Sequence, residues 1–325
     1  MKKNLKSAVL AAAAAGLSLM TVATATQAVA ATAPLSQARI VTHFDLAQGQ
    51  MPENAVIEPN GSVDVTFAAA RQVARIDRGG ATQILATLPA PSDGGVQTPV
   101  LGFPLTTGLV RTDDGTLYVL YATGTADLTG LWRLKPGHRA PERIAALPAD
   151  GLPNGLAFDP SSRAFYITDS VLGTVWRVPA NGGRATAWST APELAAQGFL
   201  GANGARVHEG ALWVTNLDQG TVLSLPLRGG HRASTPTVRA TGLEGIDDFA
   251  FTGRGNEILA ALNGPGTVVR IADDGTQTTV LDSSDGLQNP TSVAIRGTDV
   301  YVPSAAYLTA TDPNLLHARL NRHGH

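Results

Sequence analysis

The sequence predicts an all-β protein, a six-bladed β-propeller with four-stranded antiparallel blades. First, a strand pattern of an apolar residue, a variable residue, usually Arg, and an aliphatic residue recurs roughly every 45 to 60 residues. Second, a further β-rich run lies upstream of each copy. Third, the chain lacks long 3.6-residue periods and contains 35 Gly and 20 Pro. Short strands in units of this length are typical of propellers. The copies of the pattern are Val73–Ile76, Leu131–Leu134, Val175–Val178, Val222–Leu225 and Val268–Ile271.

Each repeat can be divided into four strands. The innermost strand is often followed by a turn signal, such as Pro-Asn-Gly at 59–61 or Asp-Asp-Gly at 113–115, which is typical of a hairpin. The second β-rich run and the Arg pattern follow, and an outer strand can come last, as at Thr82–Leu85. This division places the blades at 53–97, 98–150, 151–197, 198–244, 245–288 and 289–320.

The sixth repeat differs from the others. Its second run is Asp299–Pro303, but no clear Arg pattern follows. We therefore expect residues 38–44, near the start of the chain, to supply an outer strand to this last blade. Such a pairing would join the two ends of the chain and remove open sheet edges.

The first thirty residues predict a secretory signal peptide. Lys2, Lys3 and Lys6 precede an apolar run at 8–22, and Ala28-Val29-Ala30 offers a small-residue cleavage site. We expect cleavage near Ala30 and export from the cell. An uncleaved anchor helix is the alternative, although the run is short for a membrane span.

Residues 31–325 are then expected to form a single propeller domain, with no membrane insertion of the mature chain. A short flexible tail is expected at the C-terminus, containing His317, His323 and His325.

The composition excludes several classes of function. The chain is 43% hydrophobic and 15% charged, with a net charge of −2, so neither disorder nor a nucleic-acid partner is expected. Because it has no Cys, disulfides, thiol catalysis and Cys-ligated zinc are excluded. The partner that we expect is a small-molecule substrate.

Polar residues recur four positions before the first apolar anchor of each innermost strand. Innermost strands begin near the central channel, so these side chains should converge. Two carboxylates, two carboxamides and two hydroxyls form an all-oxygen set, which suits a hard cation such as Ca²⁺ better than a soft metal. The alternative is that Pro-Glu-Asn and Pro-Asn-Gly are simply turns. The residues are Glu53, Thr106, Asn154, Asn203, Asp247 and Thr291.

Three stretches resemble the gluconolactonase and senescence-marker-protein (regucalcin) family of six-bladed propellers. They are 152–159, 167–178 and 201–215. The resemblance implies one divalent cation at the channel mouth, held by Glu53, Asn203 and Asp247, with Asn154 beside it as a metal or substrate contact.

Asp248 follows Asp247, and related paraoxonase-type propellers also carry two consecutive polar residues at this place. We expect Asp248 to contact substrate, together with Asn154, Thr106 and Thr291.

The leading hypothesis is Ca²⁺-dependent hydrolysis of a lactone or related ester, with Asp247 as general base. Two alternatives stay open. The stretch Asp169–Arg177 is also similar to secreted propellers of biosynthetic gene clusters, which favours a non-hydrolytic cyclisation in secondary metabolism. A non-catalytic binding module is the other alternative, because propellers host many functions.

Overall fold

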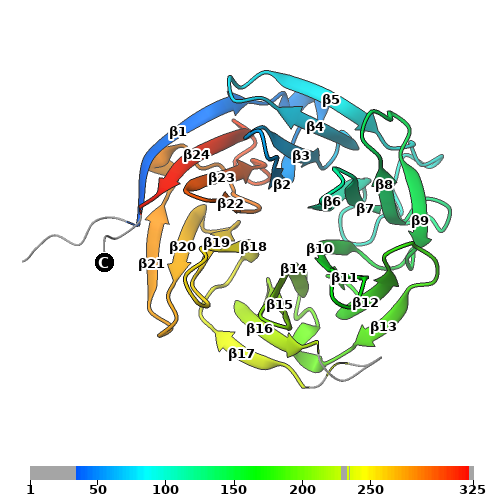
Figure 1. Ribbon diagram of the computed structural model, residues 1–325. Helices are drawn as coiled ribbons and strands as arrows, with labels where there is room; N and C mark the ends of the chain where they lie inside the picture. Colours follow the sequence, from blue (N-terminus) through cyan, green and yellow to red (C-terminus); the bar gives the residue numbers. More distant parts are fainter. Residues whose placement is uncertain (1–33, 228–232, 234, 322–325) are drawn as a thin grey trace, which may run out of the picture. The chain divides into compact units, whose positions relative to one another are not determined.

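The computed structural model describes residues 34–227, 233 and 235–321. Within them, 24 strands form six four-stranded antiparallel sheets that are arranged as blades around a central axis (Figure 1). The predicted six-bladed propeller is therefore confirmed. The signal peptide with its cleavage site, His323 and His325 lie outside the described residues.

The blades follow one another in chain order, and each has its first strand innermost. The first three blades are β2 (Pro52–Ile57), β3 (Val63–Phe67), β4 (Gln72–Ile76) and β5 (Thr82–Thr87); β6 (Leu105–Arg111), β7 (Leu117–Ala122), β8 (Gly130–Leu134) and β9 (Glu142–Ala146); and β10 (Pro153–Asp159), β11 (Ala164–Asp169), β12 (Thr174–Pro179) and β13 (Thr186–Ser189). The next two are β14 (Ala202–His208), β15 (Ala211–Asn216), β16 (Thr221–Pro226) and β17 (Thr237–Ala240); and β18 (Ile246–Phe251), β19 (Ile258–Leu262), β20 (Thr267–Ile271) and β21 (Gln277–Leu281). Short 3₁₀ turns lie at Leu46–Gln48, Pro192–Leu194 and Ser283–Asp285.

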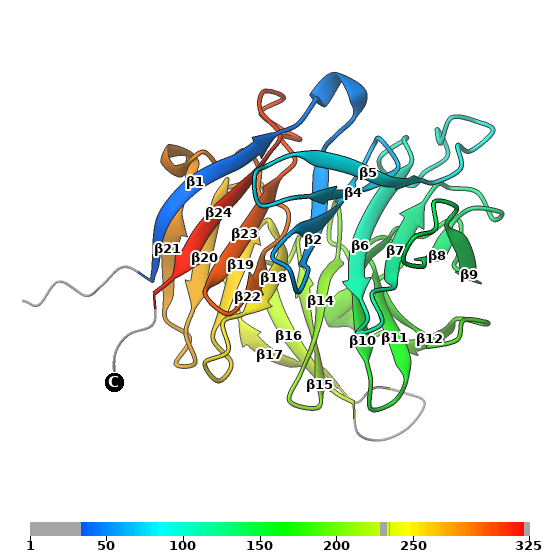
Figure 2. The ribbon, with the colours of Figure 1, turned by 45° about the horizontal axis from the view of Figure 1, so that its top comes forward.

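The sixth blade is completed by the N-terminal strand. It consists of β22 (Ala294–Arg296), β23 (Asp299–Ser304), β24 (Asn314–Leu320) and β1 (Leu35–His43), and Figure 2 shows β1 running along β24. The two strands are antiparallel, and Leu35 is paired with Leu320. The expected closure by an N-terminal strand is confirmed.

The expectation that His317 lies in the flexible tail was wrong. His317 is part of β24, and its Nε2 atom lies 2.9 Å from Oδ1 of Asp299 on the neighbouring strand β23.

The hydrophobic core is divided among the gaps between blades. Six of the buried apolar clusters each join two adjacent blades, so each blade packs against both of its neighbours. Trp213 of the fourth blade, for example, belongs to the same cluster as Phe249 of the fifth. A seventh cluster, around Leu105, Leu152 and Leu200, lies where the innermost strands begin. That cluster is part of the surroundings of the candidate site.

A register irregularity follows the start of the innermost strands β2, β6, β10, β14 and β18. In β10, for example, it lies between Pro153 and Leu156. A β-bulge re-aims the side chains next to it. The bulges therefore coincide with the polar positions that the repeat register singled out.

Threonines of the second strands connect these bulges from blade to blade. Thr168 Oγ1 accepts a hydrogen bond from the Gly155 amide at 2.8 Å and donates to the Asn203 carbonyl of the next blade. Thr215 likewise accepts from the Gly204 amide at 2.7 Å and donates to the Asp247 carbonyl at 2.5 Å. These buried bonds fix the backbone at Asn203 and Asp247.

Close approach of the backbone explains the glycine at 155. A Cβ atom there would overlap with the Asn203 carbonyl oxygen, which the Thr168 hydroxyl also contacts. We expect Gly155→Ala to lower the free energy of unfolding by about 1–3 kcal/mol, because overpacking forces the backbone to shift. Urea unfolding measures the loss.

Gly264→Ala is the matched control for this substitution. A Cβ atom at Gly264 would meet no atom within 4 Å, and its φ is not in the left-handed region. We expect a change within about 0.5 kcal/mol. Equal losses in the two variants would contradict the packing argument.

Candidate active site

The starts of four innermost strands enclose one cavity. Glu53, Asn154, Asn203 and Asp247 all line it, and each is the second residue of its strand. The cavity has a volume of about 250 Å³. The structure thus brings together the four residues for which the sequence predicted a metal site. Their roles as ligands or catalyst stay predictions.

Two acidic side chains lie close to each other in this cavity with little exposure to solvent. Glu53 is 7% exposed and Asp247 is 6% exposed. Burial raises the pKa of Glu53 to about 7; the hydrogen bond from Tyr307 opposes this rise, and the charge of Asp248 adds to it. Burial raises the pKa of Asp247 well above its usual value, and the charges of Glu53 and Asp248 raise it further.

The donor set fits a hard divalent cation. Among the described residues that line the cavity there is no Lys, Arg or His, so nothing there neutralises the two carboxylates. Carboxylate and amide oxygens are the ligands that Ca²⁺ prefers. The described residues contain no group of three or more His, Cys, Asp or Glu side chains that could hold a metal ion. A cation here would therefore depend on the amides of Asn203 and Asn154 as well as on the acids.

Tyr307 is a site residue that the sequence did not reveal. It lies in the loop between β23 and β24, and its hydroxyl donates a hydrogen bond of 2.6 Å to Glu53 Oε2. Burial and the neighbouring Glu53 raise the pKa of Tyr307 well above its usual value, so the phenol keeps its proton and remains a donor. The loop is longer than the equivalent connection between the second and third strands of the other blades, so Tyr307 has no equivalent position in the repeat that could identify it.

Thr106 and Thr291 do not line the cavity, although they occupy the same register as the four cavity residues. The Thr106 hydroxyl donates to the Phe67 carbonyl at 2.7 Å, and the Thr291 hydroxyl donates to the Pro52 carbonyl at 3.0 Å. Both side chains are fully buried between blades. The prediction that they contact substrate is not supported, because their hydroxyls are used to join neighbouring blades.

Asp248 does not line the cavity either. Its Oδ2 atom accepts hydrogen bonds from Arg206 at 2.6 Å, Asn54 at 2.8 Å and Ser292 at 3.0 Å. Arg206 also lines the opposite part of the channel, a space of about 430 Å³. Asp248 is thus a structural residue below the cavity, and the predicted substrate contact is not supported.

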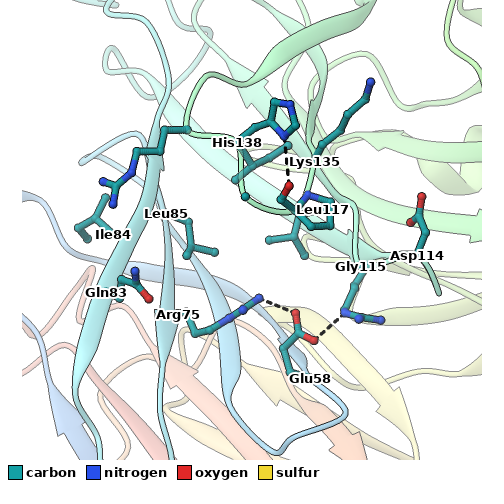
Figure 3. Close-up of a pocket in the computed structure, with 15 residues that line it drawn as sticks. Glu58, Arg75, Gln83, Ile84, Leu85, Asp114, Gly115, Leu117, Lys135 and His138 are labelled. Atoms are coloured by element: carbon teal, nitrogen blue, oxygen red, sulfur yellow. Dashed lines mark hydrogen bonds and ion pairs between the residues drawn. The ribbon is translucent and has the colours of Figure 1, made fainter.

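A second cavity, of about 460 Å³, lies near the other end of β2 (Figure 3). Its buried acid, Glu58, forms ion pairs with Arg75 at 2.5 Å and with Arg111 at 2.8 Å. Lys135 and His138 also line this cavity. Because its acid already has two cationic partners, this cavity does not offer the unneutralised carboxylates of the first.

No family model and no curated protein sequence matches the chain. Solved structures with a similar fold include the calcium-binding protein regucalcin from Agrobacterium tumefaciens, with a TM-score of 0.63 and 16% identity over 88% of this chain and 95% of that one. A protein provisionally assigned as a gluconolactonase has a TM-score of 0.63 and 15% identity over 88% and 92% of the two chains. A catalytically inactive variant of virginiamycin B lyase from Staphylococcus aureus, solved with quinupristin, has a TM-score of 0.56 and 15% identity over 84% and 82%.

These likenesses concern the fold. The chain shares the propeller fold of regucalcin and of the assigned gluconolactonase, as the sequence resemblance implied. The same fold is also found in a lyase. The activity of this chain must therefore be argued from its own cavity.

Proposed function

We propose that the chain is an exported hydrolase that opens a lactone or a related ester with the help of a bound calcium ion. One observation carries the proposal: the buried acids Glu53 and Asp247 share a cavity with three carboxamides and with no described cationic side chain. Uncompensated buried acids are costly in a folded protein, and a divalent cation would offset that cost.

Glu53, Asp247 and Asn203 would hold the cation, with Asn154 beside it. Asn154 Nδ2 donates a hydrogen bond of 3.1 Å to Ser170 Oγ, which leaves its amide oxygen as the acceptor for a ligand. When bound, calcium would polarise the ester carbonyl and stabilise the negative charge that develops on its oxygen.

The chain's own residues would position the reactants and move the proton. Tyr307 fixes the Glu53 carboxylate through its hydrogen bond. Asp247 would take a proton from water as the water oxygen bonds to the carbonyl carbon. The ester C–O bond then breaks, and the leaving oxygen receives that proton, so the product is a hydroxy acid.

Metal analysis and a lactone screen test the proposal together. We expect the purified mature protein to retain about one calcium ion per chain, because the proposal places a single ion in the cavity. EDTA should abolish lactone hydrolysis, and added calcium should restore it. Full turnover after chelation, or a folded and calcium-loaded protein that is inert towards the whole panel, would count against the proposal.

A non-hydrolytic reaction is the second candidate, because most of the residues that line the cavity are apolar. A cyclisation guided by shape would need no metal, so its activity should survive EDTA. A route that depends on histidine finds no support, because no described histidine lines the cavity.

Export is a separate part of the proposal. It rests on the basic, apolar and Ala-Val-Ala segments of residues 1–30. Among the described residues, no helix is long and apolar enough to cross a bilayer. Recovery of the chain from the culture medium, with a mass that corresponds to cleavage near Ala30, tests this part.

A further inference from the structure

The cavity that contains Glu53 and Asp247 has apolar walls. Eight of its fourteen lining residues are Leu or Phe. Most of them come from the connections that precede or link the blades. They are Leu101, Phe103, Leu105, Leu152, Phe199, Leu200, Leu217 and Leu308.

Two of these apolar residues are held in exposed positions at the cavity. Phe199 is 49% exposed and Leu308 is 70% exposed. Asp218 Oδ2 accepts a hydrogen bond of 2.9 Å from the Phe199 amide, and Asn289 Oδ1 accepts one of 2.9 Å from the Leu308 amide. The loop that contains Phe199 and the loop that contains Leu308 are thus fixed by side chains from other segments. Exposed apolar residues around a cavity mark a place for an apolar ligand.

The polar groups around the cavity bond to protein atoms or are the proposed ligands of the cation. The Asn263 amide nitrogen donates to the carbonyls of Asn289 and Pro290, and Tyr307 donates to Glu53. A ligand with many hydroxyls would find few free partners there, and buried hydroxyls without partners are unfavourable. The charged residues among the described lining are two acids, so a single bound divalent cation leaves no net positive charge there to attract an anionic ligand.

We infer that the cavity accepts an uncharged ester or lactone with a hydrocarbon chain or ring, and that Phe199 and Leu308 select for this apolar part. The ester portion of the inference rests on the proposed function, whereas the apolar portion rests on the walls. A cavity of about 250 Å³ has room for on the order of eight non-hydrogen atoms, given about 30 Å³ for each water-sized group. The substrate class is therefore small, apolar lactones rather than sugar lactones.

A homologous series of γ-lactones tests this inference on the calcium-loaded mature protein. From γ-butyrolactone upward, we expect kcat/KM to rise roughly three- to fourfold for each added methylene until the cavity is filled. Glucono-δ-lactone should be a poorer substrate than the alkyl lactones. A series without any dependence on chain length, or a preference for glucono-δ-lactone, would overturn the inference.

Substitutions of Phe199 and Leu308, the two exposed residues at the mouth of the cavity, test whether they select the substrate. Phe199→Ser and Leu308→Ser should each reduce the gain for each methylene to less than about twofold, because part of the apolar contact is lost. Val238→Ser is the matched control, since Val238 is 50% exposed but lies in the outer strand β17. It should keep the wild-type dependence on chain length. If kcat/KM depends on chain length in both variants as it does in the wild type, Phe199 and Leu308 do not select the substrate.

Binding without turnover separates this inference from the proposed function. Alkyl lactams, which resist hydrolysis, are titrated calorimetrically into the protein after chelation. Lactam affinity that rises with chain length and falls in Phe199→Ser would support the apolar site. If no lactone is hydrolysed at the same time, only the proposed function fails. Lactone hydrolysis combined with lactam affinity that does not depend on chain length would overturn the inference alone.

Discussion

Asp247→Asn is expected to lose calcium binding and lactone hydrolysis together, while the metal-free protein keeps its stability or gains some. The substitution removes a buried acid whose pKa is raised by burial and by the neighbouring charges of Glu53 and Asp248. It therefore relieves repulsion in the metal-free fold and removes both a ligand and the proposed base. We expect hydrolysis to fall by at least about 100-fold, the size that is usual for a general base.

Thermal unfolding with and without calcium provides a readout that is independent of activity. Calcium at 100 times its Kd would stabilise the wild-type protein by about 2.7 kcal/mol, and this gain should disappear in Asp247→Asn. Glu209→Gln, which removes a surface acid that is 70% exposed, should keep the full gain. A normal calcium-dependent shift of Tm in Asp247→Asn would refute the assignment of Asp247 as a ligand.

The repeat explains why much of the fold and part of the site could be predicted. One strand pattern recurs in five of the six blades, so the sheets follow from periodicity and the closing strand follows from edge pairing in the sixth blade. The same register identifies the second residue of five innermost strands, and it placed Glu53, Asn154, Asn203 and Asp247 around one cavity. The register sets the position of a residue along its innermost strand, and the carboxylate and carboxamide side chains at this position line the cavity.

Register does not fix what a side chain contacts. The hydroxyls of Thr106 and Thr291 are short and find the carbonyl of a neighbouring strand, so they join blades instead of lining the cavity. Asp248 lies next to Asp247 in sequence, but it bonds to Arg206 instead. Tyr307 and the apolar mouth lie in loops that differ from blade to blade, and their positions depend on distant partners such as Asn289.

Asp248→Ala is expected to destabilise the fold strongly without removing the calcium site. Asp248 accepts hydrogen bonds from Asn54 of the first blade, Arg206 of the fourth and Ser292 beside the sixth. Its side chain is 4% exposed and that of Arg206 is 23% exposed. Truncation would leave a largely buried guanidinium without its counter-charge and two donors without an acceptor. Breaking such a pair lowers the free energy of unfolding by about 3–5 kcal/mol.

An exposed ion pair is the appropriate comparison for this prediction. Arg133 and Glu142 lie 2.7 Å apart, closely similar to the 2.6 Å between Arg206 and Asp248, but the Glu142 side chain is 64% exposed. Glu142→Ala should therefore change the free energy of unfolding far less than Asp248→Ala does in urea titrations, because solvent screens an exposed ion pair. If Asp248→Ala is equally mild, the hydrogen bonds and the ion pair of Asp248 contribute little to holding the blades together. If it also abolishes calcium binding in the folded protein, the separation between the structural residue Asp248 and the cavity residue Asp247 is wrong.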